Sequence, residues 1–273
     1  MAVTLVDLSI GYNTPIHEKL NINFEKGKWH FFIGSTGSGK STLLQTISKL
    51  IQPIKGEVLY LDKNLKERET LLNFRNQYGV IFQYTDKQFF NHTVKDEILF
   101  NLKKREKDQK VLDERLGEML TLLNIKEGLL ERSPFELSGG QKRMVALASI
   151  LITSPSIIFL DEPTVGLDIE SKTLFFKIMK ELNKRGVTII QVTHFLEDVL
   201  EYGDTVSIFS NGNFKFYPDT EILLNKDAVL EANLEPPEII YINESFEKYG
   251  VKPSAKSVKE LVEMLKGAKY EKI

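Results

Sequence analysis

Apolar residues recur along this chain with two different spacings, and segments of the two kinds alternate. Short continuous apolar runs at residues 29–33, 156–160 and 187–192 are typical of strands that are buried on both faces. The segments 43–50 and 170–183 instead carry apolar residues at helical spacing. This alternation of strand and helix predicts an α/β fold with a parallel, doubly wound core sheet.

Segments near the start and the end of this region have the pattern of antiparallel strands. Residues 3–9 and 20–24 alternate apolar and polar positions, with a loop containing Pro15 expected between them. They predict an antiparallel β part at the N-terminus. Residues 206–209 and 213–217 predict two closing strands joined by an Asn-Gly turn.

The middle of the chain and its C-terminal end are expected to be helical. Residues 94–102 and 111–123 have helical apolar spacing, so a helical subdomain is expected to be inserted at about 84–150. Past Pro218 the pattern is again mostly helical. We therefore expect one large domain at 1–220 and a C-terminal helical extension at 221–273.

Composition narrows the classes of function. The 36 basic and 38 acidic residues are interspersed and give a net charge of about −2, which disfavours nucleic acid as the main ligand. The absence of cysteine excludes disulfides and thiolate metal sites and fits a reducing compartment. No signal peptide is evident, and no apolar run approaches the ~18–20 residues of a membrane span. We expect a soluble, cytosolic protein.

A glycine-rich stretch between the first buried strand and the first helix carries the clearest chemistry. It reads G-x-x-x-x-G-K-S, the pattern of a phosphate-binding loop. The glycines let backbone N–H groups approach an anion, and the helix that follows adds its positive end. Lys40 can reach the β- and γ-phosphates, and the Ser41 hydroxyl is suited to Mg²⁺. The residues expected to bind the nucleotide here are Gly34, Ser35, Thr36, Gly37, Ser38, Gly39, Lys40, Ser41 and Thr42.

Two carboxylates follow the buried strand at 156–160. Ligands of α/β sheets bind at the carboxyl ends of the strands, so Asp161 and Glu162 are placed for chemistry. Successive residues of a strand point in different directions, and the two carboxylates should therefore have different roles. Asp161 is expected to bind Mg²⁺, and Glu162 to orient the attacking water.

A second anion site is indicated by a short motif before another helix. Ser138 is a good N-cap, and the next two glycines expose backbone amides at the positive end of the helix. The residues concerned are Ser138, Gly139, Gly140 and Gln141. This motif is separate from the phosphate-binding loop.

Together these motifs resemble the nucleotide-binding domain of ATP-binding-cassette (ABC) ATPases over roughly residues 1–220. The resemblance implies a P-loop NTPase fold of the ABC type that hydrolyses ATP with Mg²⁺. It also implies a head-to-tail dimer, in which the signature loop at 138–141 of one domain caps the ATP held by the other. Residues 34–42 then match the Walker A loop, and residues 157–162 match the Walker B strand.

The same resemblance assigns roles to residues that would be ambiguous alone. Gln83 matches the Q-loop glutamine, which senses the Mg²⁺ site and the transporter subunit, and His194 matches the switch histidine at the γ-phosphate. Asp168 falls in a segment similar to the D-loop at the dimer interface. Tyr12 matches the aromatic residue that stacks on adenine. His17, His30 and His92 have no such context and receive no role.

The segment 82–98 is similar to the ATPases of energy-coupling factor (ECF) importers of vitamins and metal ions. Thr85 and Phe89 in this segment, and Asn101 shortly after it, depart from the residues usual in these ATPases. This resemblance implies a second ABC ATPase, a paralogue, as partner. It also implies a transmembrane coupling subunit, for which Asp86 is a candidate contact, and a substrate-binding membrane subunit. The protein would then be peripheral, on the cytoplasmic face of the cell membrane.

Other classes of protein fit the sequence less well. A soluble ABC ATPase of DNA repair places long coiled coils or large domains between Walker A and signature, where this chain has about a hundred residues. A translation-type ABC factor carries two cassettes, and a P-loop kinase lacks the signature and His194. An ABC transporter of another class remains the main alternative. The sequence does not identify the transported substrate.

Overall fold

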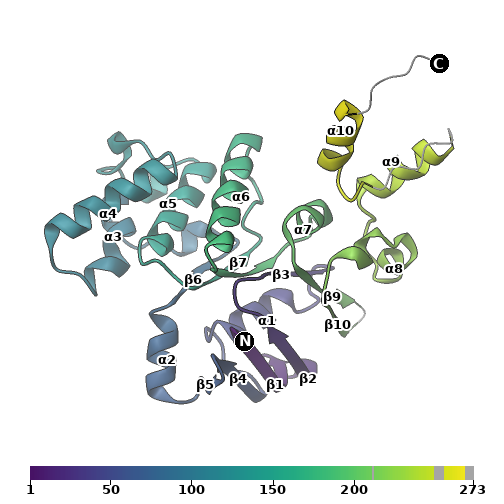
Figure 1. The fold of residues 1–273 in the computed structure, drawn as a ribbon. Coiled ribbons are helices and arrows are strands. Elements are labelled where there is room, and N and C mark those ends of the chain that lie inside the picture. Colours follow the sequence, from purple (N-terminus) through teal and green to yellow (C-terminus); the bar gives the residue numbers. More distant parts are fainter. Residues whose placement is uncertain (211, 249–254, 268–273) are drawn as a thin grey trace.

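A six-stranded sheet forms the centre of the computed structural model, which describes residues 1–210, 212–248 and 255–267. Its neighbouring strands run parallel except for the edge pair β10–β9, which is antiparallel. The order is β10 (Asn213–Tyr217), β9 (Thr205–Ser210), β3 (Trp29–Gly34), β8 (Thr188–Val192), β7 (Ile157–Asp161) and β6 (Tyr78–Ile81). Figure 1 shows helices above and below this sheet. The expected α/β fold with a parallel core sheet is confirmed.

The central strands are mostly apolar because both of their faces are covered. Successive residues Phe31 and Phe32 of β3 belong to two different buried clusters, and so do Ile157 and Ile158 of β7. Since neighbouring strand residues point to opposite faces, a strand between two cores carries apolar residues at successive positions rather than at alternate ones.

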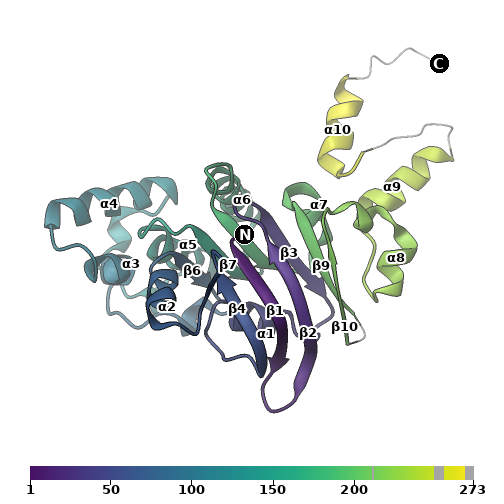
Figure 2. The same cartoon turned by 60° about the horizontal axis from the view of Figure 1, so that its bottom comes forward.

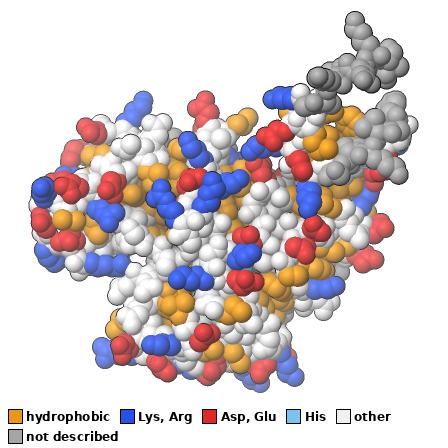
Figure 3. Space-filling model, in the orientation of Figure 1, with side chains coloured by type: hydrophobic (Ala, Val, Ile, Leu, Met, Phe, Trp, Pro, Cys, Tyr) orange, Lys and Arg blue, Asp and Glu red, His pale blue; other side chains and the backbone are white. Residues whose placement is uncertain are grey.

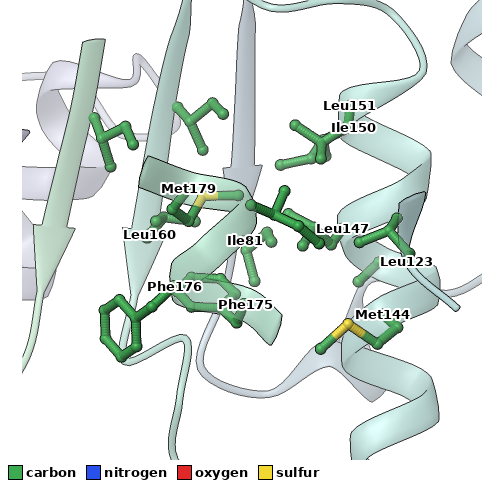
Figure 4. Close-up of a cluster of buried hydrophobic side chains, with 14 of the residues drawn as sticks. Ile81, Leu123, Met144, Leu147, Ile150, Leu151, Leu160, Phe175, Phe176 and Met179 are labelled. Carbon is green, nitrogen blue, oxygen red and sulfur yellow. The ribbon is translucent and has the colours of Figure 1, made fainter. Parts of the chain in front are cut away.

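The cluster on one face of the sheet is packed by helices. Figure 4 shows Ile81 and Leu160 from the strands against Leu147 of one helix and Met179 of another. The helices on this side are α5 (Gly139–Leu151), α6 (Ile169–Lys184) and α7 (Leu196–Tyr202).

The second cluster lies between the core sheet and a four-stranded antiparallel sheet (Figure 2). Helix α1 (Lys40–Ile47) supplies Leu43 and Leu44 to this cluster. The order of the second sheet is β2 (Pro15–Phe24), β1 (Val3–Gly11), β4 (Lys55–Tyr60) and β5 (Lys63–Asn64), and α2 (Arg68–Arg75) follows it in the chain. The expected loop around Pro15 is wrong, because Pro15 begins β2 and pairs with Gly11. An edge strand tolerates a proline at its first position, since no ladder hydrogen bond is lost there.

All elements between β6 and β7 are helical and form the left part of Figure 1. They contribute Ile98, Leu116 and Val145 to the first cluster, which joins them to the core sheet. In chain order they are η1 (Thr85–Lys87), α3 (Val94–Lys103), α4 (Gln109–Leu122), η2 (Glu127–Leu129), η3 (Pro134–Glu136) and α5.

The C-terminal helices are divided between two packing environments. Leu223 and Val229 belong to the first cluster, which lies on the helix-covered face of the core sheet. Ile239 and Leu261 belong to a small separate cluster. The elements are η4 (Glu221–Leu224), α8 (Lys226–Glu231), α9 (Glu238–Glu247) and α10 (Val258–Gly267). The expected turn residue Asn211 lies outside the described residues. Among the described residues, no helix combines the length and apolar character that crossing a bilayer requires.

Candidate functional site

The candidate nucleotide site lies at the carboxyl ends of four neighbouring strands, β3, β8, β7 and β6. The glycine-rich loop follows β3, His194 follows β8, Glu162 follows β7, and Gln83 follows β6. The first and the last of these residues are more than 150 positions apart in the sequence. The parallel sheet brings them to one edge, which is where α/β proteins bind their ligands.

The phosphate loop closes around its own lysine. The Lys40 Nζ donates to the carbonyl oxygens of Gly34 at 2.8 Å and Ser35 at 2.7 Å, and to the Ser38 Oγ at 3.4 Å. Lys40 and Thr42 are buried, while Ser35, Thr36 and Gly37 are exposed at the rim. Burial lowers the pKa of Lys40, and the carboxylates of Glu162 and Asp161 oppose that shift. An anion at this rim would offset the desolvation of the lysine.

Ser41 and Asp161 are in direct contact. The Ser41 hydroxyl donates to Asp161 Oδ1 at 2.9 Å, and burial raises the pKa of Asp161. Mg²⁺ prefers oxygen ligands, usually one or two from protein together with phosphate and water, so this donor set fits it. A divalent cation would also favour the charged form of the buried carboxylate. The pair is therefore suited to hold Mg²⁺.

Glu162 and His194 form a second contact pair at this edge. The His194 Nδ1 lies 3.0 Å from Glu162 Oε2, and the Glu162 backbone N–H donates to the Val192 carbonyl at 3.1 Å. The Glu162 backbone has a φ of 46°, a left-handed conformation that costs a residue with a Cβ free energy. The side chain of Glu162 is only 12% exposed, whereas that of His194 is 54% exposed. The carboxylate thus lies inside the edge and the imidazole faces outward.

Gln83 lies just past β6 and is exposed, and a side chain of helix α5 holds its backbone in place. The guanidinium of Arg143 donates to the carbonyl oxygens of Phe82 at 2.8 Å and Gln83 at 3.0 Å. Arg143 is buried, and burial lowers its pKa. Sequence reasoning missed this residue. The sequence feature that could have indicated it is its helical spacing. Arg143 precedes the apolar residues Leu147 and Leu151 by four and eight positions, so it lies on the buried face of α5.

The signature motif begins α5, at a different place from the phosphate loop that begins α1 (Figure 1). Ser138 and Gln141 form a capping box, in which the Ser138 N–H donates to Gln141 Oε1 at 3.1 Å and the Gln141 N–H donates to Ser138 Oγ at 3.4 Å. Ser138, Gly139 and Gln141 are exposed, and Gly140 is half-buried. The motif is therefore open to a second molecule.

Asp168 caps α6 rather than contacting the nucleotide site of its own chain. Its Oδ1 accepts from the Ser171 N–H at 2.7 Å, and this hydrogen bond holds the pKa of Asp168 below its usual range. The side chain of Asp86 lies outside the described part of the chain.

Tyr12 lies in the turn between β1 and β2 and is 68% exposed, so its ring is free to stack on a base. His17 on the same hairpin is buried and contacts Ser38 of the phosphate loop. No role for His17 was predicted from the sequence. Alternation from the buried Leu20 would place Ile16 on the inner face and position 17 on the outer face. The sequence pattern therefore does not indicate that His17 is buried.

The profile of the ABC transporter family matches residues 17–165. An energy-coupling factor transporter ATP-binding protein, EcfA2 from Acetivibrio thermocellus, is 35% identical over 250 residues that cover 89% of each chain. The chain belongs to the ABC transporter family. A second relative, the ATP-binding protein EcfA3 from Oenococcus oeni, is 33% identical and covers 97% of this chain and 96% of its own.

Solved ABC proteins share the fold. The structure of cbiO1 from Clostridium perfringens, described as part of the ABC transporter complex cbiONQ, has a TM-score of 0.73 and 29% identity, covering 89% of this ABC protein and 98% of its own chain. The dimeric cassette MJ0796 bound to ADP and Pi has a TM-score of 0.70 and 26% identity, covering 78% and 98%. ABC ATPase domains bind ATP with Mg²⁺, which agrees with the expected ligands.

Proposed function

We propose that this chain is the ATP-hydrolysing subunit of an energy-coupling factor importer. The observation that carries the proposal is the pairing of Glu162 with His194 beside the phosphate loop, in a chain whose relatives are ECF ATP-binding proteins along nearly their full length. ATP hydrolysis in this subunit drives uptake through its membrane partners. The chemical class of the transported substrate is a vitamin or a metal ion, as the resemblance implies.

The residues of the site have distinct roles in this proposal. The loop at residues 34–42 binds the phosphates, with Lys40 at the β- and γ-phosphates, and Tyr12 stacks on adenine. Ser41 and Asp161 would hold Mg²⁺, with Gln83 as a further residue at the ion, and bound Mg²⁺ would neutralise charge on the phosphates. Glu162 orients and polarises the attacking water, and His194 holds the γ-phosphate.

The dimer partner completes the site. Ser138, Gly139, Gly140 and Gln141 are exposed on a helix whose N-terminal amides suit an anion, and the structure keeps them apart from the phosphate loop of the same chain. In a head-to-tail dimer they cap the ATP of the partner, a paralogous ATPase, and Asp168 lies at the interface. Residues 1–220 act as the ATPase domain, and residues 221–273 form its C-terminal extension.

The membrane subunits dock next to Gln83 in this proposal. A groove of about 320 Å³ lies between α3 and β6, lined by Phe82, Phe90, Phe100 and Arg105 among others. Phe90 is 59% exposed, and an exposed aromatic beside a groove is typical of an interaction site. The Arg143 contact joins the backbone of Gln83 to α5. Binding of a membrane subunit in this groove would therefore act on Gln83 and on the signature helix α5 together. The protein is then peripheral, on the cytoplasmic face of the membrane.

The charge pattern is consistent with protein partners rather than nucleic acid. On the face shown in Figure 3, basic and acidic side chains are interspersed. A nucleic-acid surface would instead gather basic residues into a patch.

The test is a tagged pull-down from detergent-solubilised native membranes. We expect a second ABC ATPase and a polytopic membrane protein that is shared among small substrate-binding membrane proteins. A dedicated pair of permease subunits would retain transport and remove the ECF assignment. Soluble or nucleic-acid-bound partners alone would remove the transporter assignment.

A variant tests the docking groove in the same experiment. Phe90→Asp places a charge on the groove and should abolish recovery of the membrane subunit, with ATP binding unchanged. Phe135→Asp, on an aromatic residue of η3 that is 52% exposed, is the control and should leave recovery intact. Equal recovery with both variants would exclude this groove as the docking site.

A further inference from the structure

A β-bulge turns His17 toward the phosphate loop. Leu8 of β1 pairs with Leu20, and Ile10 pairs with His17, so between these pairs one residue of β1 opposes two of β2. The extra residue reverses the facing of the side chains. Lys19, within this interval, has a φ of 53°. As a result His17 is only 4% exposed, although simple alternation from Leu20 would place it outside.

The imidazole fixes one peptide group of the loop. Its Nε2 lies 2.7 Å from the carbonyl oxygen of Ser38. A carbonyl only accepts hydrogen bonds, so Nε2 must carry the proton and donate. In a planar trans peptide the C=O and N–H point in opposite directions. With the Ser38 carbonyl held toward β2, the N–H of Gly39 points away from β2, to the other side of the loop.

The ring also packs closely on Gly39. A Cβ built on Gly39 would lie 3.0 Å from His17 Cδ2 and 3.1 Å from Nε2, and Gly39 has a φ of 97°. Phe209 contacts the imidazole edge-on, with ring centroids 5.3 Å apart. The ring therefore has little freedom to turn away from Ser38. The hairpin that carries His17 also carries Tyr12 in its turn.

We propose that His17 is a positioning residue for nucleotide binding, which orients the Ser38–Gly39 peptide so that the Gly39 N–H faces the nucleotide phosphates. The inference rests on the proposed ATP site and adds a residue to it. The hydrogen bond that His17 makes is with the loop that binds the phosphates. Its effect is on phosphate binding and not on the base.

The experiment compares His17→Gln with His17→Met. The two side chains have similar length, and only glutamine can donate to the Ser38 carbonyl. Binding of Mg²⁺-ADP and of adenosine is measured by calorimetry or by competition with a fluorescent ADP, together with thermal unfolding. His92→Met, on an exposed histidine, is the control.

We expect His17→Met to weaken ADP binding about 10-fold, the effect of losing about one hydrogen bond from the Gly39 N–H to the phosphates. Adenosine binding should be unchanged, and His17→Gln should restore ADP affinity to within about threefold of wild type. Equal ADP affinities of the Gln and Met variants would overturn the proposal. A wild-type protein that fails to bind ADP would instead overturn the ATP site itself.

A second measurement needs no variant. In wild-type protein labelled with ¹⁵N-histidine, NMR should show His17 with a proton on Nε2 that is protected from exchange, and its resonance should shift when ADP binds. A neutral His17 ring with its proton on Nδ1 would contradict the hydrogen bond to Ser38 and the proposal with it.

Discussion

Glu162 Oε2 lies 3.0 Å from His194 Nδ1, and this contact joins the ends of β7 and β8. The carboxylate is largely buried and the imidazole is exposed. The contact involves one oxygen of the carboxylate to which we assign the attacking water. In the arrangement described here the two residues hold each other in place.

Replacing Glu162 by glutamine should separate ATP binding from turnover. Glutamine keeps the size and a hydrogen-bonding oxygen but is too weak a base to polarise water, so kcat should fall about 100-fold or more. ATP affinity should stay within about twofold, and the dimer should remain closed after ATP binds. Single-turnover kinetics and gel filtration with ATP check both points. Glu170→Gln, on an exposed residue of α6, is the control, and undiminished turnover in Glu162→Gln would remove Glu162 from this role.

Replacing Lys40 by alanine should weaken nucleotide binding itself. The side chain lies inside the loop, and its ammonium is the charge closest to the expected phosphates. We expect the dissociation constants of ATP and ADP to rise at least about 10-fold. Equilibrium binding of both nucleotides measures this, with Lys66→Ala, an exposed lysine paired with Glu57, as the control. Unchanged affinity would count against the phosphate-loop assignment.

Arg143 should be needed for the shape of the segment that follows β6. Arg143→Met leaves the carbonyl oxygens of Phe82 and Gln83 without their donor, which should lower the free energy of unfolding by about 2–4 kcal/mol. Urea unfolding measures the loss. The variant should also reduce recovery of the membrane subunit, because Gln83 lies beside the docking groove.

The control for this prediction is Arg115→Met, at an exposed arginine of α4. A surface substitution of this kind should change the free energy of unfolding by less than about 0.5 kcal/mol. If both variants had the same stability, the guanidinium contacts would contribute nothing measurable.

Asp198 should make the stability of the chain depend on pH. Burial raises its pKa in the folded protein, although Lys172 at 2.9 Å opposes the shift. The unfolded chain therefore loses the Asp198 proton at lower pH than the folded chain, from about pH 4 upward. Stability that this group provides at low pH is lost as the pH rises through its raised folded pKa.

The comparison is between wild type and Asp198→Asn. Relative to the variant, wild type should lose unfolding free energy as the pH rises above about 4, until it passes the raised pKa of Asp198 in the folded protein. Urea unfolding at several pH values measures the difference. Asp96→Asn is a control of opposite sign, because a hydrogen bond from Lys103 lowers the pKa of Asp96. A difference that does not vary with pH would show that Asp198 has an ordinary pKa.

The fold class followed from local patterns because each pattern reports a local cause. The runs 156–160 and 187–192 are rich in apolar residues without strict alternation, since their strands have a core on each face, and this predicts a parallel sheet covered by helices. The phosphate loop was equally readable, because its glycines and Lys40 act within one short segment.

Other features depended on contacts that no local pattern encodes. The pairing of Glu162 with His194 exists because β7 and β8 are neighbours, which strand order decides and spacing in the sequence does not. Arg143 is hidden for a similar reason, since its partners are backbone carbonyls 60 and 61 positions away. Every residue has a backbone carbonyl, so the residue types at 82 and 83 do not indicate that an arginine binds there.

The sequence by itself determined the α/β architecture, the phosphate loop and the resemblance to ABC ATPases, because periodicity and short motifs are properties of consecutive residues. Only the tertiary structure decided which distant side chains meet. His17 illustrates the limit: one extra residue in β2 reverses its facing and brings it to Ser38. Register is a property of two paired strands, so it cannot be obtained from either strand alone.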